Sequence, residues 1–139
     1  MYIKPMQTRI HSDGATIEHN GKLGTVSEVG LGVFIPSLNC GMCKRVPGIS
    51  NNEAEFKALL WAMEIAEKNG IRNPLFLMDS EIVVNRANGK RPRKKKYYNE
   101  RMDNFQKEVL SLRDRFESTE FRWIPRENNY KADWFSKNA

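Results

Sequence analysis

Long apolar segments are missing from this chain of 139 residues. No apolar run approaches the length of about 20 residues that a membrane-spanning helix needs. The first residues, MYIKPMQTRIHSDG, also lack the apolar core of a signal peptide. We therefore expect a cytoplasmic protein without a membrane partner, folded as a single domain over residues 1–139.

Cysteine and histidine are scarce, with two residues of each. A zinc site needs about four ligands, and no second Cys pair or His cluster joins Cys40 and Cys43 to complete one. A redox pair is conceivable, but the helix that follows such a pair in thioredoxin-like proteins is not predicted here. We expect two reduced, structural cysteines at a hairpin. The glycines do not form a phosphate-binding loop before a helix, which argues against a nucleotide site of that kind.

Acidic residues are absent from one short, strongly basic segment. The chain has 23 Lys and Arg against 17 Asp and Glu, a net charge of +6. Without the segment KRPRKKK at 90–96 the remaining 17 basic residues would balance the acids. A charge run is usually a solvated loop, but on an otherwise neutral domain it favours a polyanionic partner. Its basic residues are Lys90, Arg91, Arg93, Lys94, Lys95 and Lys96.

Apolar periodicity and turn residues predict an α/β fold. Ser50 and Glu53 fit a capping box before the first helix, and a polar, glycine-containing loop is expected at 18–30. The first three strands are joined by short turns and should be antiparallel, whereas helices separate the later strands, which should be parallel. The result is a five-stranded mixed sheet flanked by helices. The expected order is strands 7–12, 32–35 and 42–46, helix 54–68, strand 75–78, helices 81–87 and 99–116, strand 120–124 and helix 132–137.

The stretch LFLMDS at 75–80 ends a buried strand with a carboxylate, Asp79. Asp79 could cap a helix that begins near Glu81. It could equally belong to a ligand site, because ligands gather beyond the carboxyl ends of the strands in an open sheet. Asp13 also ends a predicted strand, so Asp13 and Asp79 would lie side by side if their strands are neighbours.

Glu55 is the residue that core packing explains worst. On a regular helix Leu59, Ala62 and Ala66 lie within about 40° of it, whereas Glu53 projects toward the polar side. An ionised carboxylate on an apolar stripe is unfavourable unless it is paired or holds a metal ion. A salt bridge is the ordinary alternative, but no Lys or Arg lies one turn away on that face.

Converging carboxylates without His or Cys favour a hard cation, magnesium or manganese. Two such ions about 4 Å apart can stabilise both the attacking and the leaving oxygen of an in-line displacement at phosphorus. A site of this kind beside a polyanion-binding segment indicates a nuclease.

Four segments resemble, in order, the motifs of the type 1 ribonuclease H family of the retroviral-integrase-like superfamily. They are SDGA at 12–15, NNEAEFKALLWAMEIA at 51–66, LFLMDS at 75–80 and RENNYKAD at 126–133. The resemblance implies a ribonuclease H-like fold. It also adds a fourth carboxylate, Asp133, which by itself would be interpreted as a solvated helix residue.

The resemblance implies a role for each carboxylate. Asp13 would bridge two Mg²⁺ ions, for which Mn²⁺ could substitute. Glu55 and Asp79 would hold the ion on the leaving-group side, and Asp133 the ion that activates the attacking water. The implied reaction is hydrolysis of the RNA strand of an RNA/DNA hybrid, with 5′-phosphate and 3′-hydroxyl products.

The resemblance also implies contacts with the substrate. Gly14, Asn51 and Asn52 would line the minor groove of the hybrid, where 2′-hydroxyls mark the RNA strand. Asn129 would support the site, and Glu81 stands where relatives often have a substrate-binding Gln.

Three departures from the family pattern are visible, and one of them is Glu81, which places negative charge near the nucleic acid. The mobile-loop His of many members is missing from residues 123–126, which favours slower turnover, and His11 is expected to be an ordinary strand residue. The basic run is short, and no separate hybrid-binding domain is expected.

We expect a monomer. The alternatives are a nuclease for DNA junctions and a non-catalytic RNA-binding module, against which the Asn51–Asn52 pair and the four acids argue.

Overall fold

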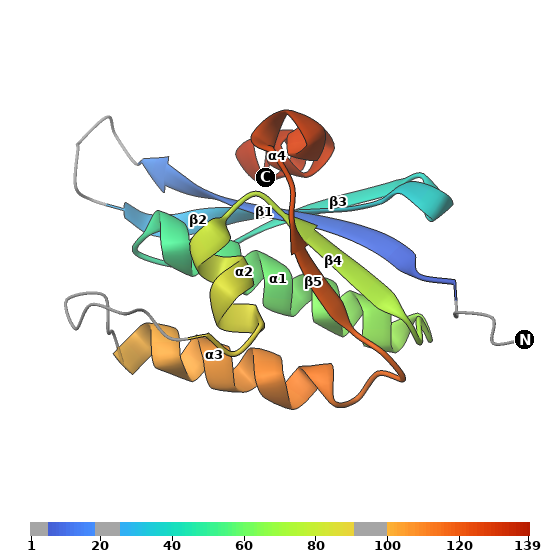
Figure 1. Cartoon of the computed structure of the whole chain (residues 1–139). Helices are drawn as coiled ribbons and strands as arrows, with labels where there is room; N and C mark the ends of the chain where they lie inside the picture. The colour runs from blue at the N-terminus through green and yellow to red at the C-terminus, as the bar shows by residue number, and fades with distance from the viewer. Residues whose placement is uncertain (1–5, 19–25, 91–99) are drawn as a thin grey trace, which may run out of the picture.

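The computed structural model describes residues 6–18, 26–90 and 100–139. Five strands form one sheet in the order β3-β2-β1-β4-β5 (Figure 1). Helix α4 lies alone on one face of the sheet, and α1, α2 and α3 lie on the other. The strands are β1 (Thr8–Glu18), β2 (Val26–Ile35), β3 (Cys40–Pro47), β4 (Pro74–Met78) and β5 (Glu120–Trp123). The helices are α1 (Asn51–Lys68), α2 (Glu81–Ala87), α3 (Glu100–Arg113) and α4 (Tyr130–Lys137), with short 3₁₀ turns η1 (Pro36–Leu38) and η3 (Arg126–Asn129).

The pairing of the strands confirms the predicted mixed sheet. β2 pairs antiparallel with both β1 and β3, whereas β4 pairs parallel with both β1 and β5. The core lies between the sheet and α1, with α3 packed on α1 and α2. A stacked pair of rings joins α1 to α3, since Phe56 contacts Phe105 with centroids 5.5 Å apart, and another joins β4 to β5 within the sheet, where Phe76 contacts Phe121 at 5.6 Å.

The loop predicted at 18–30 is wrong over its second half, because β2 begins at Val26. Gly30, at the end of the predicted loop, and Gly32, in the predicted strand at 32–35, both pack against α4. A Cβ on Gly32 would lie 2.2 Å from the carbonyl oxygen of Ala132, and one on Gly30 would lie 2.0 Å from that of Ser136. The backbone of α4 therefore rests directly on β2, at a distance that only glycine permits.

The start of α1 follows the capping prediction, with one correction. Ser50 Oγ accepts the N–H of Glu53 at 3.1 Å, and the Glu53 carboxylate accepts the N–H of Ile49 at 2.8 Å. Glu53 does not project toward a polar side as predicted, since it is fully buried and forms ion pairs with Lys57 at 3.3 Å and with Arg101. The reason is tertiary: α3 brings Arg101 over this flank of α1.

The structure describes both cysteines and, of the basic run, only Lys90. Cys40 and Cys43 are free and lie in β3. Lys90 is exposed, and the rest of the basic run (Arg91, Arg93, Lys94, Lys95 and Lys96) lies outside the described residues. None of the helices in the described part of the chain combines the length and the hydropathy of a transmembrane span.

Candidate active site

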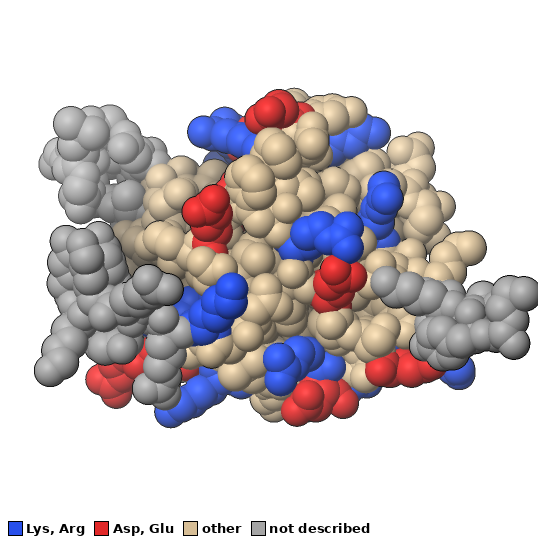
Figure 2. All heavy atoms as spheres, viewed as in Figure 1, with Lys and Arg blue, Asp and Glu red and all other residues tan. Residues whose placement is uncertain are grey.

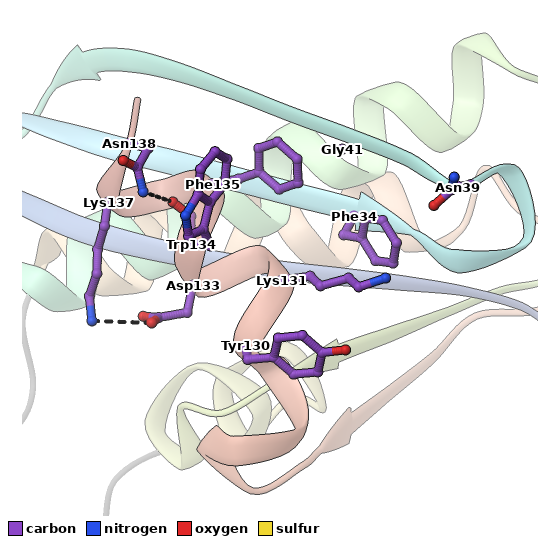
Figure 3. A pocket seen from close by; sticks show the side chains of 10 residues that line it. All are labelled: Phe34, Asn39, Gly41, Tyr130, Lys131, Asp133, Trp134, Phe135, Lys137 and Asn138. Carbon is purple, nitrogen blue, oxygen red and sulfur yellow. Dashed lines mark hydrogen bonds and ion pairs between the residues drawn. The ribbon is translucent and has the colours of Figure 1, made fainter.

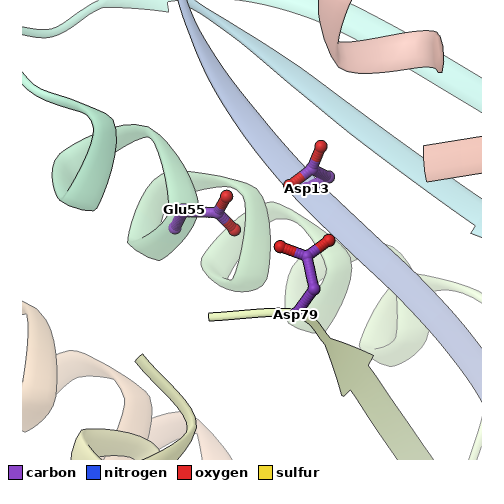
Figure 4. Close-up of side chains that lie close together, drawn as sticks. All are labelled: Asp13, Glu55 and Asp79. Atoms are coloured by element: carbon purple, nitrogen blue, oxygen red, sulfur yellow. The ribbon is translucent and has the colours of Figure 1, made fainter. Parts of the chain in front are cut away.

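Unequal strand lengths bring Asp13 and Asp79 together. β1 pairs with β4 only as far as His11 opposite Leu77, and β4 ends at Met78 while β1 continues to Glu18. Asp79 therefore emerges beside β1 (Figure 4). Asp13 lies in the middle of β1, opposite Gly32 of β2, and not at a strand end as predicted.

Ser80, and not Asp79, is the cap of α2. Ser80 Oγ accepts the N–H of Val83 at 3.3 Å, and α2 begins one residue later, at Glu81. The cap interpretation of Asp79 is therefore wrong, and its carboxylate is available to the site.

Close packing of α1 on β1 places Glu55 beside Asp13. A Cβ on Gly14 would lie 2.2 Å from the carbonyl carbon of Ala54 and 2.5 Å from the nitrogen of Glu55, so glycine lets the helix touch the strand. The N–H of Gly14 donates to the Glu55 carboxylate. Carboxylate oxygens of Asp13, Glu55 and Asp79 lie within 4.8 Å of one another. Asp13 and Glu55 are only 4% and 5% exposed.

Burial and mutual repulsion make this cluster favour protons when no cation is bound. Burial raises the pKa of Asp13 to about 7, with a lowering contribution from its hydrogen bond to Glu55 and a raising one from the charge of Asp79. Burial and the charge of Asp13 raise the pKa of Glu55 well above its usual range. A cation among these oxygens would replace the protons and screen the charges.

The cluster fits a hard divalent cation. Glu55 Oε2 is buried and has no hydrogen-bond partner among the described residues, so one carboxylate oxygen is left without a structural function. A buried, unpaired oxygen of this kind is unfavourable unless a ligand satisfies it. Three carboxylates and no His or Cys form an oxygen donor set, which suits Mg²⁺ or Mn²⁺.

Asp133 reaches the edge of the cluster from α4. Its carboxylate forms ion pairs with Lys137 at 3.1 Å and Arg126 at 4.0 Å, and the first of these is visible in Figure 3. Burial by itself would raise the pKa of Asp133. Hydrogen bonding to Asp13 and the ion pair with Lys137 outweigh this effect and hold the pKa below its usual range. Asp133 also borders a cavity of about 630 Å³ between α4 and the hairpin of β2 and β3.

Ser136 is a site residue that sequence reasoning missed. It is fully buried, and its hydroxyl lies 3.2 Å from Asp13 Oδ2 and 2.8 Å from the carbonyl oxygen of Asp133. The spacing of three residues from Asp133 places both side chains toward the same flank of α4. The packing of α4 on the sheet, with the glycines of β2 directly beneath it, brings that flank to Asp13, and the sequence carries no local signal for this packing.

Asn129 and Trp123 hold Asp79 in place. The Asn129 side-chain amide, only 1% exposed, donates to Asp79 Oδ2 at 2.9 Å and to the carbonyl oxygen of Ser12 at 3.0 Å. The indole N–H of Trp123 donates to the carbonyl oxygen of Asp79 at 3.1 Å. The first contact agrees with the supporting position expected for Asn129, whereas nothing in the sequence singles out Trp123.

The expected substrate residues lie around the cluster. Asn51 and Asn52 are exposed in the first turn of α1, and Glu81 is exposed at the first residue of α2. Gly14 is buried under α1. On the face shown in Figure 2 the described Lys and Arg side chains alternate with Asp and Glu.

The amino-acid sequence matches one family model and resembles a mycobacterial protein. Residues 37–139 match the model of the reverse transcriptase-like family. Over 94 residues, 65% of this chain, it is 30% identical to the bifunctional protein Rv2228c of Mycobacterium tuberculosis. The chain spans about a quarter of the length of that relative, of which 24% is covered.

Solved structures are similar over almost the whole chain. The N-terminal RNase H domain of Rv2228c from Mycobacterium tuberculosis superposes with a TM-score of 0.76 at 23% identity, covering 97% of this chain and 94% of that one. RNase H1 from the archaeon Halobacterium salinarum gives 0.75 at 21% identity, covering 96% and 97%. LC11-RNase H1, solved in complex with an RNA/DNA hybrid, gives 0.75 at 24% identity, covering 96% of each chain. These similarities establish a ribonuclease H-like fold.

Proposed function

Because the chain belongs to the reverse transcriptase-like family, we propose that it is a ribonuclease H that hydrolyses the RNA strand of RNA/DNA hybrids with divalent metal ions. The observation that carries the proposal is the cluster of Asp13, Glu55 and Asp79, whose oxygens lie within 4.8 Å of one another and include the unpaired Glu55 Oε2. A purely structural cluster would be expected to pair its buried oxygens internally.

The cluster residues have distinct tasks in this reaction. Asp13, Glu55 and Asp79 would hold one Mg²⁺ or Mn²⁺ ion, and Asp133 with Asp13 a second. Bound ions of this kind polarise a phosphate and generate hydroxide from water near neutral pH. Asp133 stays ionised because it is paired with Lys137.

Neighbouring side chains keep the carboxylates in one arrangement. Ser136 orients Asp13, and Asn129 orients Asp79. Reacting groups that are held in place lower the barrier, because less ordering remains for the transition state.

The surroundings of the cluster suit a hybrid. Asn51 and Asn52 present exposed amides in the turn of α1 that precedes Glu55, where they can contact 2′-hydroxyls in a minor groove. The basic run at 90–96 would contact phosphates without sequence preference. Together these contacts select the shape of a hybrid and the ribose of one strand.

A panel of labelled substrates tests this proposal. We expect the purified chain to cut RNA paired with DNA, and to leave single-stranded RNA, duplex DNA and a four-way DNA junction intact, in Mg²⁺ or Mn²⁺. The products should carry 5′-phosphate and 3′-hydroxyl ends. Equal cleavage of duplex DNA, or preferential cleavage of the junction, would show that the substrate assignment is wrong. Binding of RNA without cleavage in either metal would indicate a binding module.

A further inference from the structure

The buried side chain of Asn129 contacts three groups. Two of these groups belong to neighbouring residues of β1 and the third to the residue after β4: Asn129 Nδ2 lies 2.9 Å from Asp79 Oδ2 and 3.0 Å from the carbonyl oxygen of Ser12, and Asn129 Oδ1 lies 3.1 Å from Nδ1 of His11. A backbone carbonyl and an ionised carboxylate only accept hydrogen bonds. The amide nitrogen must therefore face Ser12 and Asp79, and the amide oxygen must face His11.

This arrangement determines which nitrogen of His11 carries a proton. The Asn129 oxygen can only accept, so Nδ1 of His11 must donate to it. The neutral ring with a proton on Nδ1 and the doubly protonated ring both provide this donor. The contact therefore does not depend on the ionisation of His11.

Strand pairing and ring packing hold the imidazole in this position. His11 lies opposite Phe34 in the register of β1 and β2, and the two ring centroids are 6.4 Å apart. His11 lies two residues before Asp13, so both side chains point to the face of the sheet that α4 covers. The ring is thus positioned by the same strand that carries Asp13.

Without the His11 donor the amide oxygen of Asn129 would be buried and unsatisfied. A buried acceptor without a partner is unfavourable, so the amide would turn or shift to find water. Asp79 Oδ2 would then lose its donor. The Asp79 backbone would stay in place, because the indole N–H of Trp123 holds its carbonyl oxygen independently.

We propose that His11 is a positioning residue, which acts through Asn129 to hold the Asp79 carboxylate in the geometry that binds a divalent cation. The proposal rests on the function proposed above. His11 neither touches the substrate nor transfers a proton. Its ring provides a fixed hydrogen-bond donor, which joins β1, η3 and the residue after β4.

Two substitutions of His11 separate the effect of its hydrogen-bond donor from the effect of its ring packing. His11→Phe keeps an aromatic ring against Phe34 and removes the donor, whereas His11→Asn places an amide N–H where Nδ1 was. We expect His11→Phe to lower both kcat for hybrid cleavage and the Mg²⁺ affinity measured by calorimetry, each about 10- to 100-fold. The KM for the hybrid should stay close to the wild-type value, and the melting temperature in EDTA should fall by no more than several degrees, because the fold remains but the Asn129 amide oxygen loses its donor. His11→Asn should recover most of both losses.

A double-mutant cycle tests the route through Asn129. In an Asn129→Ala background, His11→Phe should change neither Mg²⁺ affinity nor kcat further, because the link is already missing. Additive losses would overturn the proposal, as would wild-type Mg²⁺ affinity in His11→Phe. If the wild type cleaves hybrids and His11→Phe matches it, the proposal fails while the ribonuclease function stands. If the wild type cleaves no hybrid, the function fails, and calorimetry still decides the role of His11.

Discussion

Single residues set the proton balance of the site. Burial raises the pKa of Asp13 and of Glu55, whereas hydrogen bonding to Asp13 and the pair with Lys137 hold the pKa of Asp133 below its usual range. The direction follows from burial: Glu55 and Asp13 are almost completely buried, whereas the Asp133 side chain is 24% exposed and paired with Lys137.

Stability without metal should fall as the pH rises toward neutrality. The pKa of Asp13 is raised from 3.8 to about 7 in the fold, so the folded state binds more protons than the unfolded state above about pH 4. The stabilisation is complete below pH 4 and is lost as the pH passes 7, at about 1.4 kcal/mol for each pH unit between these two values. Urea unfolding in EDTA at pH 5 and pH 8 measures this. Asp13→Asn should flatten the dependence, and an equally steep dependence in Asp13→Asn would contradict this account.

Asp79→Asn should separate function from stability. It removes one of several close negative charges, so the metal-free protein should be at least as stable as the wild type, with cleavage severely reduced. It should also gain less from added Mg²⁺, because stabilisation by a ligand scales with its affinity. Melting curves in EDTA and in Mg²⁺ measure both effects.

Ser80→Ala is the matched control for Asp79→Asn. It removes the cap of α2 and should lower the free energy of unfolding by about 1 kcal/mol with or without metal, while cleavage survives. If Asp79→Asn behaved in the same way, Asp79 would be a structural residue.

At the scale of elements, the glycines of β2 determine where α4 can sit. Asp133 and Ser136 both reach Asp13 from α4, so the distance between α4 and β2 controls the site. Gly32 lies opposite Asp13 in the pairing of β1 and β2. The packing of one helix on one strand is therefore part of the catalytic geometry.

Gly32→Ala should displace α4 and impair the site. Its Cβ would lie 2.2 Å from the carbonyl oxygen of Ala132 and 2.5 Å from the nitrogen of Ser136, both backbone atoms that cannot move aside alone. We expect a loss of stability of about 2 kcal/mol or more, with a fall in kcat. Unfolding and cleavage assays measure these effects.

Gly70→Ala is the control for this prediction. Gly70 has a φ of +67° and open space around its Cα, so alanine should lower stability by about 1–2 kcal/mol through backbone strain alone. Cleavage by the folded protein should be unchanged. Equal kcat values for the two variants would mean that the position of α4 does not matter.

Elements with local signals could be predicted from the sequence. The cap at Ser50, the periodic helix that follows it and the buried strand at 75–78 all depend on neighbouring residues, and all are found. The start of β2 could not be predicted in this way, because its glycines acquire their purpose only from α4. The burial of Glu53 carries no local signal either, because its partner Arg101 lies 48 residues away.

Some residues of the candidate site could be predicted from local sequence, and others could not. Glu55 is identifiable because a carboxylate on an apolar helix face contradicts local packing, and Asp79 because it ends a buried strand. Asp133 follows from the family resemblance alone. Ser136, Trp123 and the hydrogen bond between His11 and Asn129 could not be predicted, because each joins segments that meet only in the folded chain.

At the scale of the whole molecule, the excess of positive charge comes from one short stretch of the sequence. Lys and Arg alternate with Asp and Glu on the face shown in Figure 2, whereas the run at 90–96 accounts for the net charge of +6. A nucleic acid would therefore be attracted mainly by this run.

Removing the charge of this run should weaken the salt dependence of binding. Phosphate contacts release counterions, so the logarithm of the hybrid affinity should fall with the logarithm of salt concentration by somewhat under one unit per contact. A variant with Lys94→Ala, Lys95→Ala and Lys96→Ala should show a shallower slope in fluorescence anisotropy. A slope equal to that of the wild type would mean that these lysines are only solvated.

The central claim is that buried carboxylates hold the metal ions that cut RNA in a hybrid. Its most direct test is the rate of cleavage of a hybrid with a labelled RNA strand, measured from excess EDTA through rising Mg²⁺ concentrations. We predict no cleavage in EDTA and a rate that rises with Mg²⁺ until the site is saturated. Cleavage that persists in EDTA, or a folded protein that binds the hybrid and never cuts it at any Mg²⁺ concentration, would contradict the claim.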